Sequence, residues 1–296
     1  MQAGCVQLER VAGCATPCFR MCSLVAVGRI VYLKVIRFSR RCWIMISLAR
    51  IQNTGLVSAL LLILNVAYAH AQQIGPLASR VFGNGTSNLI FVLHGDLSDG
   101  SPADYHQSFA REVSEKIRNA TVVAIVRPGY ADSRGLKSPG SNNGKIDQYT
   151  KTNNDLVAAT IDAFRKSVKP QRVVAVGHSG GAAQVGAIIG RFPGLIDSAV
   201  LVSCPCDIQA WRSSNNRSPW PNSQSPADFL KSVPKQTRIV AITGQNDSNT
   251  RPSLARSYVE QASALGLSAQ ALIVNGGHGF NSISRDVLKS VVGLAR

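Results

Sequence analysis

Charged residues, and acidic residues above all, are scarce in this chain of 296 residues. Asp and Glu number 16 against 32 Lys and Arg, charged residues make up only 16%, and hydrophobic residues make up 45%. A mainly disordered chain has the opposite balance, and 25 Gly with 13 Pro are too few for a collagen-like chain. The composition therefore indicates a globular protein, of one large domain or two small ones.

Residues 72–296 also lack recognition motifs for nucleic acids, phosphate loops and dinucleotide fingerprints. Their four histidines are dispersed, and one residue separates Cys204 from Cys206, which matches no usual zinc pattern. Basic residues are scattered, with no run longer than Arg165-Lys166. The sequence therefore predicts no metal, no cofactor and no nucleic-acid partner. For Cys204 and Cys206, a disulfide and two free thiols both stay open.

Much of the positive charge belongs to the front of the chain. Residues 1–71 hold 8 of the 32 basic residues, 1 of the 16 acidic residues and 5 of the 7 cysteines. Residues 72–296 keep 24 basic against 15 acidic residues, a net charge of +9. An evenly basic surface of this kind favours attraction to acidic surfaces or substrates.

A second start of the chain lies at Met45. Arg50 supplies a positively charged region, residues 56–67 form an almost uninterrupted apolar run, and Ala69-His70-Ala71 has the pattern of a cleavage site. Because the apolar run is shorter than the roughly 20 residues of a spanning helix, a cleaved secretory signal is favoured over a membrane anchor. We therefore expect a signal peptide over residues 45–71, a periplasmic or secreted mature chain, and no stable membrane anchor after cleavage.

Residues 1–44 show no helical or strand period. Cys14, Cys18 and Cys22 lie four residues apart, but no histidine accompanies them and the spacing matches no usual zinc pattern. We therefore expect Met45 to be the natural start and residues 1–44 to be an over-extended N-terminus. If the segment is made, its basic residues favour an uncleaved signal anchor instead.

Strand and helix patterns alternate through residues 72–296. Buried strands are predicted at 88–93, 121–126, 172–176, 199–202, 238–242 and 269–274, and helices at 103–118, 154–168, 182–191, 252–265 and 284–294. Strands separated by helices imply a mostly parallel sheet with helices on both faces. Residues 204–235 hold five prolines and predict an irregular excursion with one short helix. The prediction is a single α/β domain.

The segment Gly177-His178-Ser179-Gly180-Gly181 lies between the predicted strand at 172–176 and the helix from residue 182. It matches G-x-S-x-G, the nucleophile elbow, in the strand–turn–helix context that this motif requires. Glycines suit so tight a turn because neighbouring side chains would collide with the strand and the helix. The motif predicts Ser179 as a nucleophile.

A serine nucleophile needs a base to take its proton and an acid to orient the base. Asp247 follows the predicted strand at 238–242, and His278 follows the strand at 269–274. Both lie at carboxyl ends of strands, the edge that also carries Ser179. We predict His278 as the base and Asp247 as its partner. A mere turn-forming role for Asp247 and a competing role for Asp207 stay open.

An oxyanion hole needs two backbone N–H donors. Gly180, directly after the nucleophile, is one predicted donor, and Asp96 in the early loop His94-Gly95-Asp96 is the other. The Asp96 carboxylate must then point away from the oxyanion. We expect His94 to support this loop, His106 to be a solvated helix residue, and His178 to point away from the chemistry.

The motifs HGD, RPGY, GHSGG, GQND and GGHGF together resemble the α/β-hydrolase superfamily, in its serine esterase, lipase or peptidase branches. The resemblance implies an eight-stranded type of sheet with Ser179, His278 and Asp247 as the triad. Little chain precedes Asn88 once the expected signal peptide is removed, so the first strands are expected to be short or absent, built from residues 78–82. Residues 204–235, where the family usually has its lid, are short and polar, which favours small or soluble substrates over bulky lipids.

The sequence therefore predicts an exported serine hydrolase that cleaves carboxylic esters through an acyl-enzyme on Ser179. A serine peptidase or amidase with the same triad is the alternative, and Arg127, Arg134 or Arg212 are candidates to bind a peptide terminus. A binding protein that kept the fold without the chemistry is the third reading. The partner is a small ester or amide; its acyl and leaving groups, and the oligomeric state, stay open.

Overall fold

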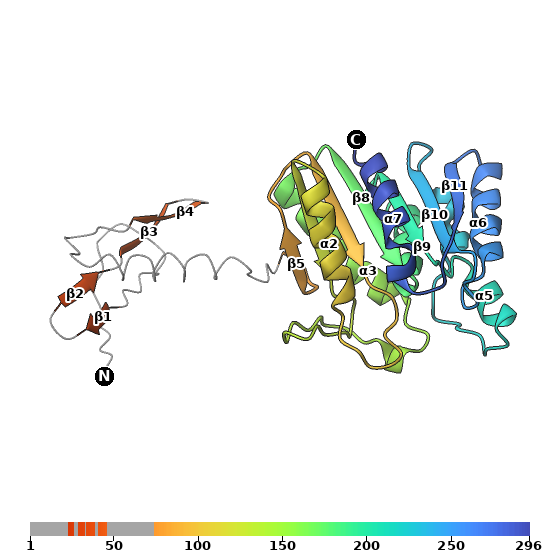
Figure 1. The fold of residues 1–296 in the computed structure, drawn as a ribbon, viewed down its shortest axis with the longest axis horizontal. Coiled ribbons are helices and arrows are strands. Elements are labelled where there is room, and N and C mark those ends of the chain that lie inside the picture. The colour runs from red at the N-terminus through yellow and green to blue at the C-terminus, as the bar shows by residue number, and fades with distance from the viewer. Residues whose placement is uncertain (1–22, 27–28, 33, 39–40, 46–73) are drawn as a thin grey trace. The chain divides into compact units, whose positions relative to one another are not determined.

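The structure is a computed structural model that describes residues 23–26, 29–32, 34–38, 41–45 and 74–296 (Figure 1). The apolar run and the cleavage site of the expected signal peptide lie outside the described residues. The chain divides into two units, residues 1–68 and residues 69–296. No helix in the described part of the chain is long and apolar enough to span a membrane.

The described part of the first unit consists of two antiparallel strand pairs. Strand β1 (Ser23–Ala26) pairs with β2 (Arg29–Tyr32), and β3 (Lys34–Phe38) pairs with β4 (Arg41–Met45). These short strands lie in a stretch where the sequence shows no strand period.

The second unit is built on one seven-stranded sheet. Its strands are β5 (Ser79–Phe82), β6 (Asn88–Leu93), β7 (Ala120–Ile125), β8 (Arg172–His178), β9 (Ser198–Val202), β10 (Arg238–Gly244) and β11 (Ser268–Val274). They are arranged in the order β11-β10-β9-β8-β6-β7-β5. Only β5 is antiparallel to its neighbour in this sheet. The predicted α/β class with a mostly parallel sheet is confirmed.

Five helices cover the two faces of this sheet. Helices α2 (Tyr105–Lys116) and α7 (Phe280–Leu294) pack on one face, in front of the sheet in Figure 1. Helices α3 (Lys151–Val168), α4 (Gly180–Arg191) and α6 (Pro252–Ala264) pack on the other face. Interior strands such as β7 are buried along their whole length because both faces are covered, which explains their continuous apolar sequences.

The start of the domain and its excursion depart from the implied fold. One short strand, β5, precedes β6 where the eight-stranded type implies more, and it falls within the expected residues 78–82. Residues 204–235 form α5 (Ile208–Ser214) and a 3₁₀ helix, η2 (Pro226–Ser232), instead of one short helix alone. A second 3₁₀ turn, η1 (Asn143–Lys145), lies in the polar loop before α3.

The carboxyl end of β9 carries the disulfide. Cys204 and Cys206 are bonded to each other and both are buried. The next residue, Asp207, is the N-cap of α5, and its carboxylate accepts a hydrogen bond from the Ala210 N–H at 2.9 Å. Asp207 is therefore engaged in holding the start of the excursion.

Candidate functional site

The predicted elbow is present as a sharp turn between β8 and α4. Ser179 has φ 51° and ψ −117°, a conformation that non-glycine residues rarely adopt. A Cβ on Gly177 would lie 2.3 Å from the Gly181 carbonyl oxygen, and a Cβ on Gly181 would lie 2.5 Å from the His94 carbonyl oxygen. Both positions therefore need glycine, and the turn sets the serine at the carboxyl edge of the sheet.

The structure brings the three predicted residues together in a hydrogen-bonded row. His278 Nε2 lies 3.2 Å from Ser179 Oγ, and His278 Nδ1 lies 2.9 Å from Asp247 Oδ2. Since a carboxylate only accepts, the network assigns the imidazole proton to Nδ1 and leaves Nε2 to accept from the serine hydroxyl. This is the orientation that a general base for Ser179 requires.

The Asp247 carboxylate is fully buried and held from its own loop. It accepts hydrogen bonds from the backbone N–H groups of Asn249 and Thr250, and from the Thr250 hydroxyl at 2.7 Å. Burial alone would raise the pKa of Asp247, but the bond and charge of His278 and the bonds from Thr250 outweigh it, so the pKa is lowered. The carboxylate thus stays ionised beside the imidazole.

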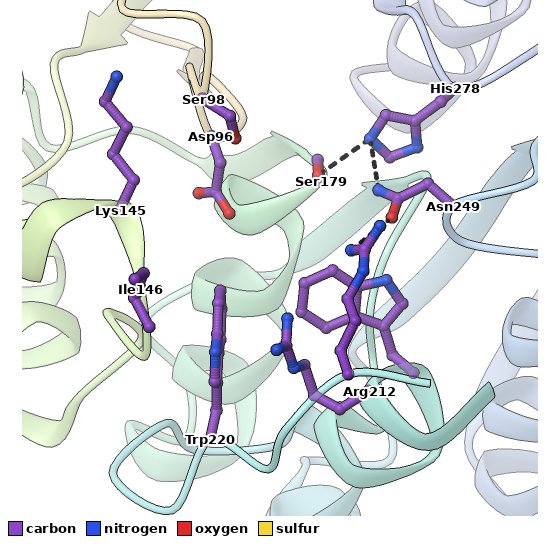
Figure 2. Close-up of a pocket in the computed structure, with 11 residues that line it drawn as sticks. Asp96, Ser98, Lys145, Ile146, Ser179, Arg212, Trp220, Asn249 and His278 are labelled. Atoms are coloured by element: carbon purple, nitrogen blue, oxygen red, sulfur yellow. Dashed lines mark hydrogen bonds between the residues drawn. The ribbon is translucent and has the colours of Figure 1, made fainter. Parts of the chain in front are cut away.

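Asn249 is a member of the site that sequence reasoning missed. Its Nδ2 lies 3.3 Å from His278 Nε2, so this nitrogen faces both the asparagine amide and the serine hydroxyl (Figure 2). Arg217 donates to Asn249 Oδ1 at 3.0 Å and fixes the direction of the amide. The only sequence signal was its place two residues after Asp247.

Both predicted oxyanion donors are free to donate a hydrogen bond. Neither the Gly180 N–H at the start of α4 nor the Asp96 N–H has a hydrogen-bond partner in the described part of the chain. The Asp96 carboxylate is turned toward other groups. Its Oδ1 lies 2.8 Å from Arg127 Nη1, and its Oδ2 accepts from the Tyr149 hydroxyl at 2.5 Å.

His94 supports this loop, as expected. It is fully buried, its Nδ1 lies 2.7 Å from the Gly95 carbonyl oxygen, and its Nε2 accepts from the Arg127 backbone N–H at 2.9 Å. Burial, followed by the charges of His106 and Arg127, holds the pKa of His94 well below its usual value. The ring is therefore neutral and links the loop to the end of β7.

Of the three arginines named for a peptide terminus, one lines the cavity. Arg127 is buried and spends its guanidinium on Asp96 and on Gln184 Oε1, at 2.6 Å. Burial lowers the pKa of Arg127, but the Asp96 charge outweighs this and the pKa is raised. Arg134 donates to Gln107 Oε1 elsewhere. Of the three, only Arg212 lines the cavity.

The side chain of His178 does not line the cavity, in line with the prediction, but it contacts the loop that carries the base. Its Nε2 lies 2.9 Å from the His278 carbonyl oxygen, and its Nδ1 lies 2.6 Å from the Tyr105 hydroxyl. That hydroxyl also accepts from the Gly95 N–H at 2.5 Å. Burial, then the charge of His278, lowers the pKa of His178 to about 4. A neutral His178 therefore connects the base loop to the oxyanion loop.

The prediction of a solvated His106 is wrong, because this residue is 0% exposed. It lies three and seven residues before Phe109 and Val113, on the buried face of α2. Its ring contacts the His94 ring, with centroids 5.0 Å apart. Burial lowers the pKa of His106 to about 4.

A cavity of about 470 Å³ opens in front of Ser179. His278 and Asn249 form one side of it, and Lys145 and Ile146 form the opposite side (Figure 2). The remaining lining comes from the loop after β6 and from the excursion, and consists of Asp96, Ser98, Trp211, Arg212, Arg217 and Trp220. The excursion thus supplies aromatic and cationic side chains to the cavity, which the sequence alone did not indicate.

Comparisons with known proteins support the fold and the family of this chain. The model of the Alpha/beta hydrolase family matches residues 89–279. The esterase Pf2001 of Pyrococcus furiosus is 14% identical with a TM-score of 0.59, over 74% of this chain and 86% of that chain. Esterase PE8 is 16% identical with a TM-score of 0.52, over 71% and 92%. A puromycin hydrolase is 12% identical with a TM-score of 0.59, over 74% and 36%.

The chain therefore belongs to the alpha/beta hydrolase family, which confirms the resemblance carried by its five motifs. A search of the curated proteins found no match. The solved structures share the fold, at identities too low to transfer a substrate. Membership of the family supports a hydrolase, the broader part of the functional prediction.

Proposed function

We propose that this chain is an exported serine hydrolase that cleaves carboxylic esters of small or soluble substrates through an acyl-enzyme on Ser179. The observation that carries the proposal is the hydrogen-bonded row of Ser179, His278 and Asp247 at the edge of an open cavity. The esterases among the similar structures are in accord with it.

In the proposed first half-reaction, Ser179 Oγ attacks the ester carbonyl while His278 Nε2 takes the hydroxyl proton. The Gly180 and Asp96 N–H groups donate to the oxyanion of the tetrahedral intermediate. The intermediate collapses, the C–O bond to the alcohol breaks, and His278 returns the proton to the departing oxygen. An acyl group then remains on Ser179.

In the second half-reaction, water attacks the acyl carbonyl and His278 takes its proton. When the second intermediate collapses, the bond between the acyl carbon and Ser179 Oγ breaks, His278 returns the proton to Oγ, and the carboxylic acid leaves. Asp247 holds the imidazole in its productive orientation and stabilises its protonated form. A cavity of about 470 Å³ suits small substrates better than long lipid chains.

The test measures hydrolysis of nitrophenyl acetate and butyrate, beside matched nitroanilides, by the full chain. Ser179→Ala is the inactive variant, and Ser98→Ala removes a different hydroxyl from the same cavity. We expect turnover of the esters by wild type and Ser98→Ala and none by Ser179→Ala. Faster cleavage of the anilides would favour the peptidase alternative. No turnover by folded wild type would favour a binding protein.

Export is part of the same proposal. The disulfide between Cys204 and Cys206 suits an oxidising compartment. N-terminal sequencing of the protein recovered from outside the cytoplasm of an expressing bacterium tests it. We expect the N-terminus of the mature protein directly after Ala71. A protein that stays in the cytoplasm with residues 1–71 intact would contradict export.

A further inference from the structure

The wall formed by the excursion carries cations stacked on indole rings. The Arg212 guanidinium lies 4.6 Å from the ring centroid of Trp220 and 5.4 Å from that of Trp211. Arg217 lies 5.6 Å from the Trp211 centroid. Figure 2 shows Arg212 beside the flat face of Trp220, inside the same cavity as Ser179. Cation–π contacts of this kind hold a guanidinium in place while its edge stays available.

The hydrogen-bonding capacity of Arg212 is largely unused. Its Nε donates to the Ser218 carbonyl oxygen at 2.7 Å, and no hydrogen bond from the described residues occupies its two Nη groups. Neither Arg212 nor Arg217 forms an ion pair with a carboxylate of the described residues. The wall therefore presents free guanidinium donors to whatever enters the cavity.

The charges of this wall repel each other. Burial, followed by the charge of Arg217, lowers the pKa of Arg212, while Tyr149 and Asp147 act in the opposite direction without cancelling the effect. One oxygen of the Asp147 carboxylate, Oδ2, accepts hydrogen bonds from the backbone N–H and the side chain of Asn222. An anion bound between the two guanidinium groups would relieve this repulsion.

The rest of the cavity adds to the positive excess. Asp96, the only carboxylate among the lining residues, is neutralised by Arg127. Lys145, on the opposite side, forms no ion pair within the described part of the chain. Three successive residues here have positive φ: Asn143 at 48°, Gly144 at 64° and Lys145 at 68°. Ile146 beside it is 58% exposed.

We propose that the substrate of this site carries an anionic oxygen group, a carboxylate or phosphate, which binds Arg212 and Arg217 while the ester carbonyl lies at Ser179. Guanidinium forks match such groups with paired, charge-assisted hydrogen bonds. This inference rests on the proposed function and narrows it to negatively charged esters. Lys145 sits at the opposite rim, where it attracts the same charge.

Two pairs of esters, each with one anionic and one neutral member, test the proposal in the full chain. The glutarate monoester of nitrophenol is compared with its valerate, and 3-acetoxybenzoate with its methyl ester, each corrected for the rate with Ser179→Ala. In at least one pair we expect the anionic member to have a kcat/KM at least about tenfold higher. Neutral esters preferred or equal in both pairs would overturn the proposal.

Variants locate the charge that causes the preference. Arg212→Gln should lower the ratio of the anionic to the neutral kcat/KM to about one, and Arg212→Lys should keep part of the preference. Lys145→Gln should reduce it less. The matched control is Arg256→Gln, since Arg256 is exposed on α6 and does not line the cavity. A preference that survives Arg212→Gln and Lys145→Gln would contradict the assignment.

A binding measurement keeps the two proposals separate. The chain has three tryptophans, so a Trp43→Phe, Ser179→Ala variant emits only from Trp211 and Trp220 in the cavity wall. We expect its fluorescence to change on titration with glutarate or inorganic phosphate, and not with valeramide. Ester hydrolysis without anion binding would overturn this inference alone. Anion binding without any hydrolysis would overturn the proposed function alone.

Discussion

The two sides of the cavity differ in whether their polar side chains have partners within the protein. On the side of the sheet edge, Ser179, His278 and Asp247 find their partners within the protein, and backbone geometry allows little variation. On the side of the excursion, Arg212 forms no ion pair with a carboxylate of the described residues, and Lys145 on the opposite side forms none either. In this account the triad, whose members bond to each other, determines the type of reaction. The cationic side chains without ion pairs determine which substrates bind.

The largest effect is expected from substitution of the base, His278, on the side of the triad. His278→Gln removes the proton acceptor of Ser179, so kcat for a neutral ester should fall by about 10⁴-fold or more. The double variant with Ser179→Ala should be no worse than either single variant, because the residues act as a unit. Steady-state kinetics check both, and a double variant that is slower by the product of the two effects would contradict a shared step.

Substitutions of Asp247 and Asp207 distinguish the two candidates for the acid of the triad. Asp247→Asn keeps the shape of the loop but loses the charge beside His278, and kcat should fall by about 10³-fold or more. Asp207→Asn is the matched control, because Asp207 caps α5 and should leave kcat within about threefold. The same ester assay decides. The reverse order of the two effects would identify Asp207 as the acid.

A smaller effect is expected where the two loops are joined. Tyr105→Phe removes the hydroxyl that bonds both the Gly95 N–H and His178, so kcat should fall about tenfold through misplacement, with KM within about twofold. Tyr258→Phe is the control, since that buried hydroxyl has no partner among the described residues. Equal kinetics for both variants, at unchanged urea midpoints, would remove the proposed link.

The smallest effect concerns stability in acid. His106 and His178 have pKa values of about 4 in the folded state, below their ordinary value of 6.5. The unfolded chain therefore binds more protons between pH 6.5 and 4, and the free energy of unfolding falls as the pH falls through that window. Each histidine contributes a slope of about 1 kcal/mol per pH unit.

Urea unfolding at pH 7, 6 and 5 measures this slope. His106→Gln removes one contribution and should flatten the pH dependence, whereas Tyr258→Phe should keep the wild-type slope. If His106→Gln leaves the slope unchanged, the buried ring titrates in the folded protein as it does in the unfolded chain.

The same division explains how far the sequence alone could lead. Strand interiors, the elbow and the order Ser179, Asp247, His278 follow from residue types at strand ends, because a parallel sheet brings those ends to one edge. The sequence also predicted β6 at its observed bounds, residues 88–93. Only local periodicity and short motifs were needed for these features.

The excursion and the loop before α3 have no such period. Their contribution to the cavity depends on which face of irregular backbone turns inward, as for Trp220 and Lys145, and only the folded structure shows that. His106 was misplaced because residue type outweighed its register with Phe109 and Val113. Asn249 was missed because its contact with His278 joins two loops 29 residues apart.

The most direct measurement locates a covalent bond on Ser179. The full chain is treated with a fluorophosphonate, digested, and mapped by mass spectrometry, beside Ser179→Ala and Asp247→Asn. We predict one adduct, on the peptide that contains Ser179, formed more slowly in Asp247→Asn and absent from Ser179→Ala. A folded wild type without an adduct, or with its adduct on another residue, would contradict the assignment of Ser179 as the nucleophile.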